Sequence, residues 1–379
     1  MTPVRNSNRD LELLSQLLLG RDANSAGAAN ADSSDSEFMN YDGQALDAVY
    51  QLSRSDLEQL ASLSQSNHVV LRVFRPLSEL LAMAGKRHEA LVAEETIEQE
   101  TARIQHALGF LSSICSALQE GGCPAIVIKS LDHWPDLGSD LDLYTHGDAR
   151  RVVELMKSHF GAHLAERSWG DRLANKWNFV VPGLPELVEL HAGRLGQTGE
   201  QTEVTVSVSA RARLVQILGH TFRVAAPEDR IVISTLQRMY RHFYIRLCDI
   251  VDNAKLVDRR LVDFEYLRAL GTRAGLWEGI ATYLVLVSEY VEGYRGFGLD
   301  LPALVRDSAR KITAGDIVFR GQFLRVPIVP HSIALYASEL KNFFMRGELR
   351  NGLRLSLMPG LATAALVEQK ITGNDKGIW

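Results

Sequence analysis

The sequence predicts an α+β protein in which a small mixed sheet with flanking helices lies between helical N-terminal and C-terminal regions. Two observations place the sheet in the middle of the chain: an apolar run at 125–128, and alternating polar and apolar residues at 139–144 and 187–191. A third observation places the helices, because apolar residues recur every three or four positions through most of 44–121 and 227–379.

Composition narrows the class of protein. At 379 residues the chain is long enough for two domains of ordinary size. Its 46% hydrophobic and 23% charged residues are typical of a soluble globular protein. The formal net charge of -5 provides no overall positive field for a long nucleic acid, which is therefore a less favoured partner than a small molecule.

The cysteines and the hydropathy pattern indicate a cytoplasmic setting. Cys115, Cys123 and Cys248 are odd in number and widely spaced, so they predict neither a disulfide framework nor a zinc motif. Such thiols fit a reducing compartment. We find no secretory signal pattern, and no run of about 18 apolar residues, so we expect no membrane span.

The first third of the chain is predicted to contain two regions. Residues 1–43 are interpreted as a flexible amino-terminal segment, because the stretch from Gly20 to Gly43 is rich in Ala, Asn, Ser and Asp. We nevertheless expect the leucine-rich stretch from Asp10 to Leu19 to dock on the body. Residues 44–121 are predicted to be helical, with helices from Ala45, over Val70–Met83 and over His88–Gln119.

Residues 122–226 are predicted to form the sheet-containing core. A helix over 149–160 is expected to cross the sheet, and two strands around Pro182 to Pro185 are expected to form a hairpin. The strands expected in this core cover 125–128, 139–144, 177–181, 187–190, 204–208 and 221–224.

Residues 227–379 are predicted to form a helical C-terminal domain. Pro227-Glu228-Asp229 is a favourable helix start, with proline in the first turn and acids at the positive end. Further helices are expected over 261–276, 277–291, 304–317 and 332–344. Arg346 to Arg354 is basic, and we favour a surface helix there over a site for an anionic partner.

The triplet Asp140-Leu141-Asp142 contains the first two carboxylates of a candidate metal site. Because strand side chains alternate, Asp140 and Asp142 share a face, and Glu189 joins them if the two strands are neighbours. Three converging carboxylates repel one another unless a cation lies between them, and their oxygens favour Mg²⁺. The alternative is that the two aspartates are turn residues and Glu189 is a solvated strand residue.

The register of the second carboxylate strand follows from the same alternation. Val188 and Leu190 need the core, so Glu189 and His191 face the other side of the sheet. Glu186 is assigned to the preceding turn. His191 is interpreted as a structural histidine rather than a ligand-binding one.

The order of these segments resembles the nucleotidyltransferase fold of the polymerase-β type. Within that superfamily the chain is most similar to the bacterial "uncharacterised nucleotidyltransferase" family, over roughly Gly122 to Val257, about a third of the chain. One departure is Lys129-Ser130, where superfamily members carry a glycine-rich turn, because serine lacks the freedom of glycine at positive φ. The matching segments are Ile128-Lys129-Ser130, Ser139 to Leu143, Glu189-Leu190-His191, Ala226 to Arg230, and the helix from Tyr240 to Asp249.

This resemblance implies an Mg²⁺-dependent nucleotidyltransferase with Asp140, Asp142 and Glu189 as catalytic and metal-binding residues. It would transfer a nucleoside monophosphate from a nucleoside triphosphate, ATP being the expected one, to a hydroxyl of a small molecule, a sugar or a protein. The nucleotide-binding residues that the resemblance implies are Lys129, Ser130, Ser139, Arg238, His242, Arg246 and Asp249.

The last four of these residues lie three or four positions apart in a predicted helix over 237–251, which puts them on one face. A surface stripe of self-paired charges is an equally supported interpretation of that face. For the whole chain, the alternative function is a catalytically inactive nucleotidyltransferase-fold module that binds or recruits a partner. A tRNA-directed transferase of the toxin type is a weaker third hypothesis.

Overall fold

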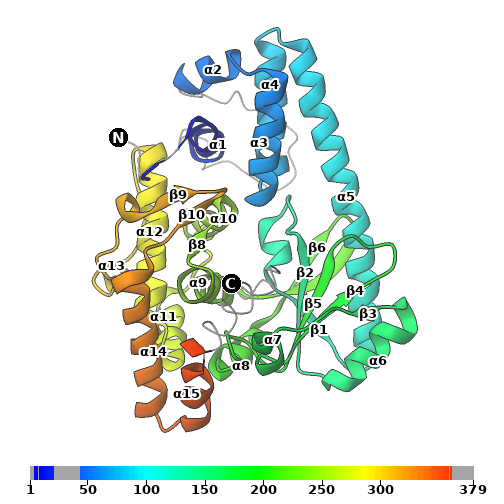
Figure 1. Ribbon diagram of the computed structural model, residues 1–379, viewed down its shortest axis with the longest axis vertical. Helices are drawn as coiled ribbons and strands as arrows, with labels where there is room; N and C mark the ends of the chain where they lie inside the picture. Colours follow the sequence, from blue (N-terminus) through cyan, green and yellow to red (C-terminus); the bar gives the residue numbers. More distant parts are fainter. Residues whose placement is uncertain (1–3, 7, 21–42, 358, 361–379) are drawn as a thin grey trace.

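The computed structural model describes residues 4–6, 8–20, 43–357 and 359–360. The fold is α+β, as predicted, with a seven-stranded mixed sheet, a small three-stranded sheet, and helical regions before and after the larger sheet (Figure 1). None of the helices described is both long enough and apolar enough to cross a membrane.

The large sheet has the strand order β3-β4-β5-β2-β1-β7-β6. Strands β2 and β5 run parallel, as do β1 and β7, whereas the other neighbours are antiparallel. The predicted hairpin is confirmed as β4 and β5, and β6 was not predicted. The strands are β1 (Ala125–Val127), β2 (Asp140–Thr145), β3 (His163–Leu164), β4 (Lys176–Val180), β5 (Leu187–Ala192), β6 (Arg213–Ile217) and β7 (His220–Val224).

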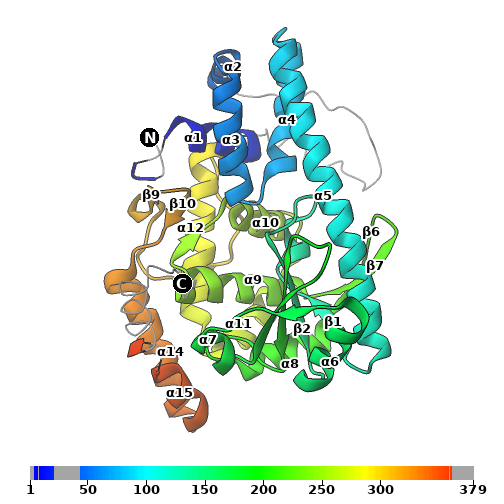
Figure 2. The same ribbon diagram turned by 45° about the vertical axis from the view of Figure 1, so that its right-hand side comes forward.

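One face of this sheet is covered by helices α5 (Arg87–Glu120) and α6 (Ala149–Phe160). The long helix α5 runs from the N-terminal helices down along the sheet (Figures 1 and 2). Leu141, Val188 and Leu190 are fully buried against these helices. The opposite face therefore carries the alternate side chains of β2 and β5, among them the predicted carboxylates.

The N-terminal helices pack on the C-terminal helices rather than forming a separate core, since one cluster of buried side chains includes both groups. Leu11, Leu14 and Leu17 of α1 are fully buried in it, so this part of the predicted flexible segment 1–43 is an ordered helix. The rest of the predicted linker, 21–42, lies outside the described residues. These helices are α1 (Arg9–Leu19), α2 (Gly43–Tyr50), α3 (Arg54–Ser66) and α4 (Val70–Met83).

The C-terminal region is mostly helical, as predicted. Its helices are α9 (Pro227–Thr235), α10 (Leu247–Asp258), α11 (Phe264–Ala274), α12 (Trp277–Arg295), α13 (Ala303–Arg306), α14 (Ile333–Met345) and α15 (Leu349–Ser356). The small sheet that interrupts them has the order β8-β10-β9 and consists of β8 (Tyr244–Ile245), β9 (Val318–Arg320) and β10 (Phe323–Arg325). Short helical turns η4 (Ala314–Asp316) and η5 (Ile328–Ser332) flank β9 and β10.

Two predicted elements outside the candidate site are wrong. The expected strand over 204–208 lies in helix α8 (Thr202–Arg211), because Val204 and Val208, four residues apart, are buried while Val206 is exposed. The expected helix over 304–317 is only the short α13 followed by loop and the η4 turn. There the backbone N–H groups of Arg310 and Ala314 donate to side chains of α12 instead of to a helical ladder.

Candidate active site

The predicted carboxylates lie side by side on one face of the large sheet. Asp142 of β2 is the direct neighbour of Glu189 in the parallel β5 strand, and Asp140 is one pleat repeat away on the same face. The register assigned to Glu189 and His191 from the sequence is therefore confirmed. The Asp140 carboxylate forms no ion pair or hydrogen bond with any described side chain, and it lies at the edge of a cleft.

Glu186 is not a free turn residue. Its carboxylate is buried and accepts a hydrogen bond of 2.5 Å from Arg103 Nη1 on α5. The backbone assignment to the residues before β5 is confirmed, but the side chain anchors that turn to a helix. Glu186 is consequently unsuitable as a neutral control for Glu189.

Two lysines neutralise the carboxylates of Asp142 and Glu189. Lys129 Nζ pairs with Asp142 and lies 3.1 Å from Glu189 Oε1. Lys176 Nζ, from β4, lies 2.6 Å from Glu189 Oε2 and 3.3 Å from Asp171 Oδ1. All of these groups are largely buried, so each charge depends on its partners rather than on water. We refer to Lys129, Asp140, Asp142, Lys176 and Glu189 as the sheet wall.

Burial and ion pairing shift the pKa values of the Asp142 and Glu189 carboxylates in opposite directions. Burial raises the pKa of Asp142 well above its usual range, although Lys129 opposes this shift. Burial also acts to raise the pKa of Glu189, but Lys129, Lys176 and His191 outweigh it and hold that pKa well below its usual range. Of these two carboxylates, Glu189 therefore keeps its negative charge more firmly.

His191 is oriented by Glu189. Its Nε2 lies 2.8 Å from Glu189 Oε1, and burial lowers the pKa of the imidazole to about 4. The ring is therefore neutral near pH 7 and donates its Nε2–H to the carboxylate. Asp142, Glu189 and His191 bring their ligand atoms within 4.8 Å of one another. His191, interpreted from sequence as structural, thus belongs to the group that could hold a metal, whereas Asp140 lies outside it.

The Lys129-Ser130 turn shows how this chain manages without a glycine. Lys129 adopts φ +63° and ψ -63°, a conformation that costs a non-glycine residue of the order of 1–3 kcal/mol. Ser130 needs no positive φ and begins the short helix η2 (Ser130–His133). Its buried hydroxyl donates to the Asp140 carbonyl (3.0 Å) and accepts from the Asp142 N–H (2.7 Å). Ser130 therefore fixes the turn to β2, while Lys129 carries the backbone strain.

A group of basic side chains lines the same cleft as the sheet wall. We refer to Arg238, Arg241, His242 and Arg246 as the arginine wall. Arg238 Nε pairs with Asp249 Oδ2 at 2.7 Å, but neither Arg241 nor Arg246 pairs with a carboxylate within the described part of the chain. Burial, reinforced by the charges of Arg241 and Arg238, lowers the pKa of His242 well below its usual range, so this imidazole is neutral.

The continuous helix predicted over 237–251 is wrong. The chain forms a π-helical turn η3 (Leu236–Arg241), reverses at Phe243 with φ +54°, adds strand β8, and only then begins α10. Strand β8 pairs with β10, about eighty residues further along the chain, and this pairing replaces the helical ladder. Arg238, His242 and Arg246 still reach one cleft, whereas Asp249 lies behind them as the partner of Arg238.

The two walls enclose a polar cleft of about 270 Å³. It gathers the predicted residues of both motifs: Lys129, Ser130, Ser139, Asp140, Asp142, Glu189, Arg238, His242 and Arg246. It also contains residues that the sequence did not single out, namely His68, His133, Lys176, Gln237 and Arg241. Lys176 could have been found, since it alternates onto the same face of β4 as the carboxylates of the neighbouring strand.

Comparisons of the chain with protein-family models, with curated proteins and with solved structures find no match.

Proposed function

We propose that the protein is an Mg²⁺-dependent nucleotidyltransferase that moves a nucleoside monophosphate from a nucleoside triphosphate to a hydroxyl acceptor, with pyrophosphate as the leaving group. The observation that carries this proposal is the charge distribution in the cleft. It is lined by carboxylates of two neighbouring parallel strands and by Arg241 and Arg246, which lack carboxylate partners among the described residues. A carboxylate wall suits a hard cation, and guanidinium groups suit phosphate oxygens. Their separation by one cleft fits a bound metal-triphosphate.

The donor set fits Mg²⁺. Asp142 and Glu189 offer carboxylate oxygens within 4.8 Å of one another, and Asp140 offers a third carboxylate at the edge of the cleft. Such hard oxygens are the protein ligands that Mg²⁺ takes, while His191 supports Glu189 by its hydrogen bond. When bound, Mg²⁺ would neutralise phosphate oxygens and polarise the phosphorus that is attacked.

In this proposal Lys129 has two alternative partners, the carboxylates of the sheet wall and a phosphate oxygen of the nucleotide. Its ammonium group now bridges Asp142 and Glu189, which is the place a cation takes. A triphosphate entering with its metal would release that ammonium group, and Lys129 would then pair with a phosphate oxygen. Lys176 stays with Glu189 and Asp171, and so holds Glu189 in register throughout.

The remaining roles follow from which groups are free. Arg241 and Arg246 would bind the phosphates, since neither has a carboxylate partner among the described residues. Asp140 lines the cleft without a side-chain partner among the described residues, so it is placed to accept the proton of the acceptor hydroxyl as that oxygen attacks. Glu189, engaged by two lysines and a histidine, would serve as a metal ligand rather than as the base. We place this activity in the cytoplasm, with ATP as the first nucleotide to test.

One observation favours a second candidate, a catalytically inactive module that binds a nucleotide or a partner. The ammonium group of Lys129 already pairs with the carboxylates of Asp142 and Glu189, so these two groups do not need a metal ion to balance their charge. If Lys129 cannot leave, the arginine wall still binds an anion but no transfer follows.

The test is incubation of the purified protein with nucleotides labelled at the α-phosphate, Mg²⁺ and a cell lysate, followed by detection of the labelled molecule. We expect label on an acceptor, and Asp142→Asn to lower its formation about a hundredfold or more. Glu154→Gln, an exposed glutamate on α6, is the matched control. Nucleotide binding without any transfer of label would instead favour the inactive module.

A further inference from the structure

A second cluster of metal-ligating side chains lies beside the cleft. His68, His133 and Cys248 are all buried, and their ligand atoms lie within 4.8 Å of one another. They come from three separate parts of the chain: the turn between α3 and α4, the end of η2, and the first turn of α10. His68 and His133 also line the cleft of the candidate active site.

The spacing of the cluster approaches that of a tetrahedral metal site. His133 Nε2 lies 3.9 Å from Cys248 Sγ. A tetrahedral zinc ion with a nitrogen ligand at about 2.0 Å and a sulfur ligand at about 2.3 Å separates those ligand atoms by about 3.5 Å. For this pair of ligands, a small shift therefore suffices to reach the tetrahedral spacing.

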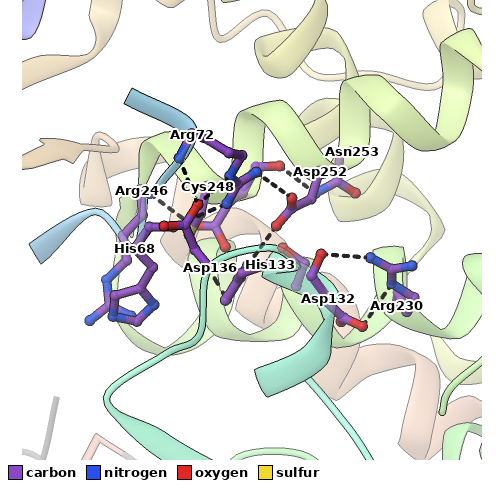
Figure 3. Close-up of polar contacts among 12 residues, drawn as sticks. His68, Arg72, Asp132, His133, Asp136, Arg230, Arg246, Cys248, Asp252 and Asn253 are labelled. Atoms are coloured by element: carbon purple, nitrogen blue, oxygen red, sulfur yellow. Dashed lines mark hydrogen bonds and ion pairs between the residues drawn. The ribbon is translucent and has the colours of Figure 1, made fainter. Parts of the chain in front are cut away.

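The second ring nitrogen of His133 is fixed by a carboxylate. His133 Nδ1 lies 2.5 Å from Asp252 Oδ2, and the other oxygen of Asp252 lies 2.7 Å from Arg72 Nη1. Figure 3 shows Asp252 between Arg72 and His133, with Arg72 held in turn by Asp136. This bond directs Nε2 of His133 toward Cys248, in the arrangement by which carboxylates orient metal-binding histidines.

His68 has no other evident purpose for its buried ring. The residue is only 8% exposed, yet its Nδ1 has no hydrogen-bond partner among the described residues. The residue is also held at φ +53°, a conformation that is uncommon outside glycine. The neighbouring Asn67 accepts the Leu247 N–H with its side chain, and its carbonyl accepts the Cys248 N–H. The turn that carries His68 is thus bonded directly to the helix start that carries Cys248.

We propose that His68, His133 and Cys248 bind a Zn²⁺ ion. Two imidazoles and one thiolate are the nitrogen and sulfur ligands that zinc prefers, and three protein ligands leave a fourth position for water. The negative charges of the Cys248 thiolate and of Asp252 together balance the ion. The same Cys248-His133-Asp252 series does not serve as a nucleophilic triad, because Cys248 has no exposed surface for a substrate to reach.

This site is independent of the proposed transferase activity, but it would act on the same cleft. His133 ends the short helix that begins directly after Lys129, so zinc would join that turn to the N-terminal helices and to α10. The ion would position the turn that carries Lys129 relative to the other residues of the cleft, without contacting the nucleotide itself.

The test is metal analysis of the full chain purified without chelators. We expect about one zinc ion per chain, and after its removal Co²⁺ should restore binding with the absorption bands of tetrahedral cobalt bound to a thiolate. Cys248→Ser and His133→Gln should abolish both signals. Asp252→Asn should weaken zinc binding about 10–100-fold, since it removes the carboxylate that orients His133.

Matched controls separate this site from the sheet wall and from the other cysteines. The double variant Cys115→Ala/Cys123→Ala leaves Cys248 as the sole thiol and should keep the thiolate-cobalt band. Asp142→Asn should keep it as well, whether or not transfer activity exists. A wild-type chain without that band, or a Cys248→Ser variant that binds zinc as tightly as wild type, would overturn the proposal. The wild-type cobalt spectrum decides the matter even if a variant fails to fold.

Discussion

The two walls of the cleft differ in how their charges are compensated. In the sheet wall, Asp142 and Glu189 are paired with Lys129 and Lys176 in a buried network. In the arginine wall, Arg241 and its neighbour Arg246 lack carboxylate partners among the described residues. The comparison teaches that the sheet wall is stable without a ligand, whereas Arg241 and Arg246 of the arginine wall gain a counter-charge only when an anion binds.

The largest expected effect on stability tests this difference directly. Glu189→Gln should lower the free energy of unfolding by about 3 kcal/mol, because it leaves Lys129 and Lys176 partly uncompensated in a buried site. Arg241→Ala should change it by less than about 0.5 kcal/mol, since no ion pair is lost. Urea unfolding of both variants is the measurement.

Glu154→Gln serves as the control for the loss of one carboxylate at an exposed position. If Glu189→Gln and Arg241→Ala lower the free energy of unfolding by the same amount, the charges of the two walls do not differ in how they are compensated. In that case the proposed role of the arginine wall as an anion site loses its physical basis.

The sheet wall was predictable because strand alternation is a local property. Once Leu141 and Leu190 are assigned to the core, Asp142 and Glu189 must share the other face, and the parallel pairing of β2 and β5 makes them neighbours. The pairing itself is not local, but a buried strand has few alternative registers. Lys176 completes this wall by the same rule.

The arginine wall was only partly predictable. The helical spacing of Arg238, His242 and Arg246 is present in the sequence, but the chain reverses at Phe243 to pair β8 with β10. That pairing partner lies far along the chain, so local periodicity cannot reveal it. Arg241, in the π-helical turn η3 before the reversal, also lines the cleft.

Helices with regular spacing and clear ends were predicted best. The helix Ala149–Phe160 has both bounds as expected, because Asp148 caps its first turn and Gly161 ends it in the left-handed conformation. The buried ion network of Arg72, Asp136, His133 and Asp252 had no signature in the sequence. Its members are far apart along the chain and meet only through tertiary packing.

The second prediction concerns nucleotide binding. Arg241→Ala and Arg246→Ala should each weaken binding of metal-free ATP about tenfold, the loss of one charge-assisted contact. Asp142→Asn should bind metal-free ATP at least as tightly as wild type, because a negative charge near the phosphates is removed. Calorimetric titration gives each dissociation constant.

Arg268→Ala, an exposed arginine on α11, is the matched control for the loss of one positive charge. If it weakens ATP binding as much as Arg241→Ala does, the attraction comes from the overall charge and not from the cleft. A weaker binding of metal-free ATP by Asp142→Asn would show that the sheet wall, too, holds the nucleotide directly.

A smaller effect is expected at Lys129, where the strained backbone and the ion pair act together. Lys129→Ala and Lys129→Gly both remove the ammonium group, but only glycine also relieves the positive φ. Lys129→Gly should therefore be more stable than Lys129→Ala by about 1 kcal/mol. Unfolding midpoints in urea compare the two, and equal stabilities would show that the turn changes shape once the ion pair is gone.

If the enzyme proposal holds, Lys129→Ala should raise the KM for the nucleotide more than it lowers kcat, as expected for uniform triphosphate binding. Equal losses in kcat and kcat/KM would assign the lysine to the transition state instead.

The smallest expected effect concerns pH and belongs to the arginine wall. Burial and the charges of Arg241 and Arg238 lower the pKa of His242 far below the value of about 6.5 that it has in the unfolded chain. Below that value the unfolded chain binds a proton that the native His242 does not, so stability falls as pH falls. At pH 6 this lowers the free energy of unfolding by about 0.8 kcal/mol, and the contribution of His242 vanishes above pH 7.

His242→Gln should remove this share of the pH dependence, while His163→Gln, at an exposed position of β3, should not. Urea unfolding at pH 7.5 and pH 6 measures it. If the difference in stability between wild type and His242→Gln is the same at both pH values, His242 is not held neutral, and an imidazolium would have to be added to the positive charge of this wall.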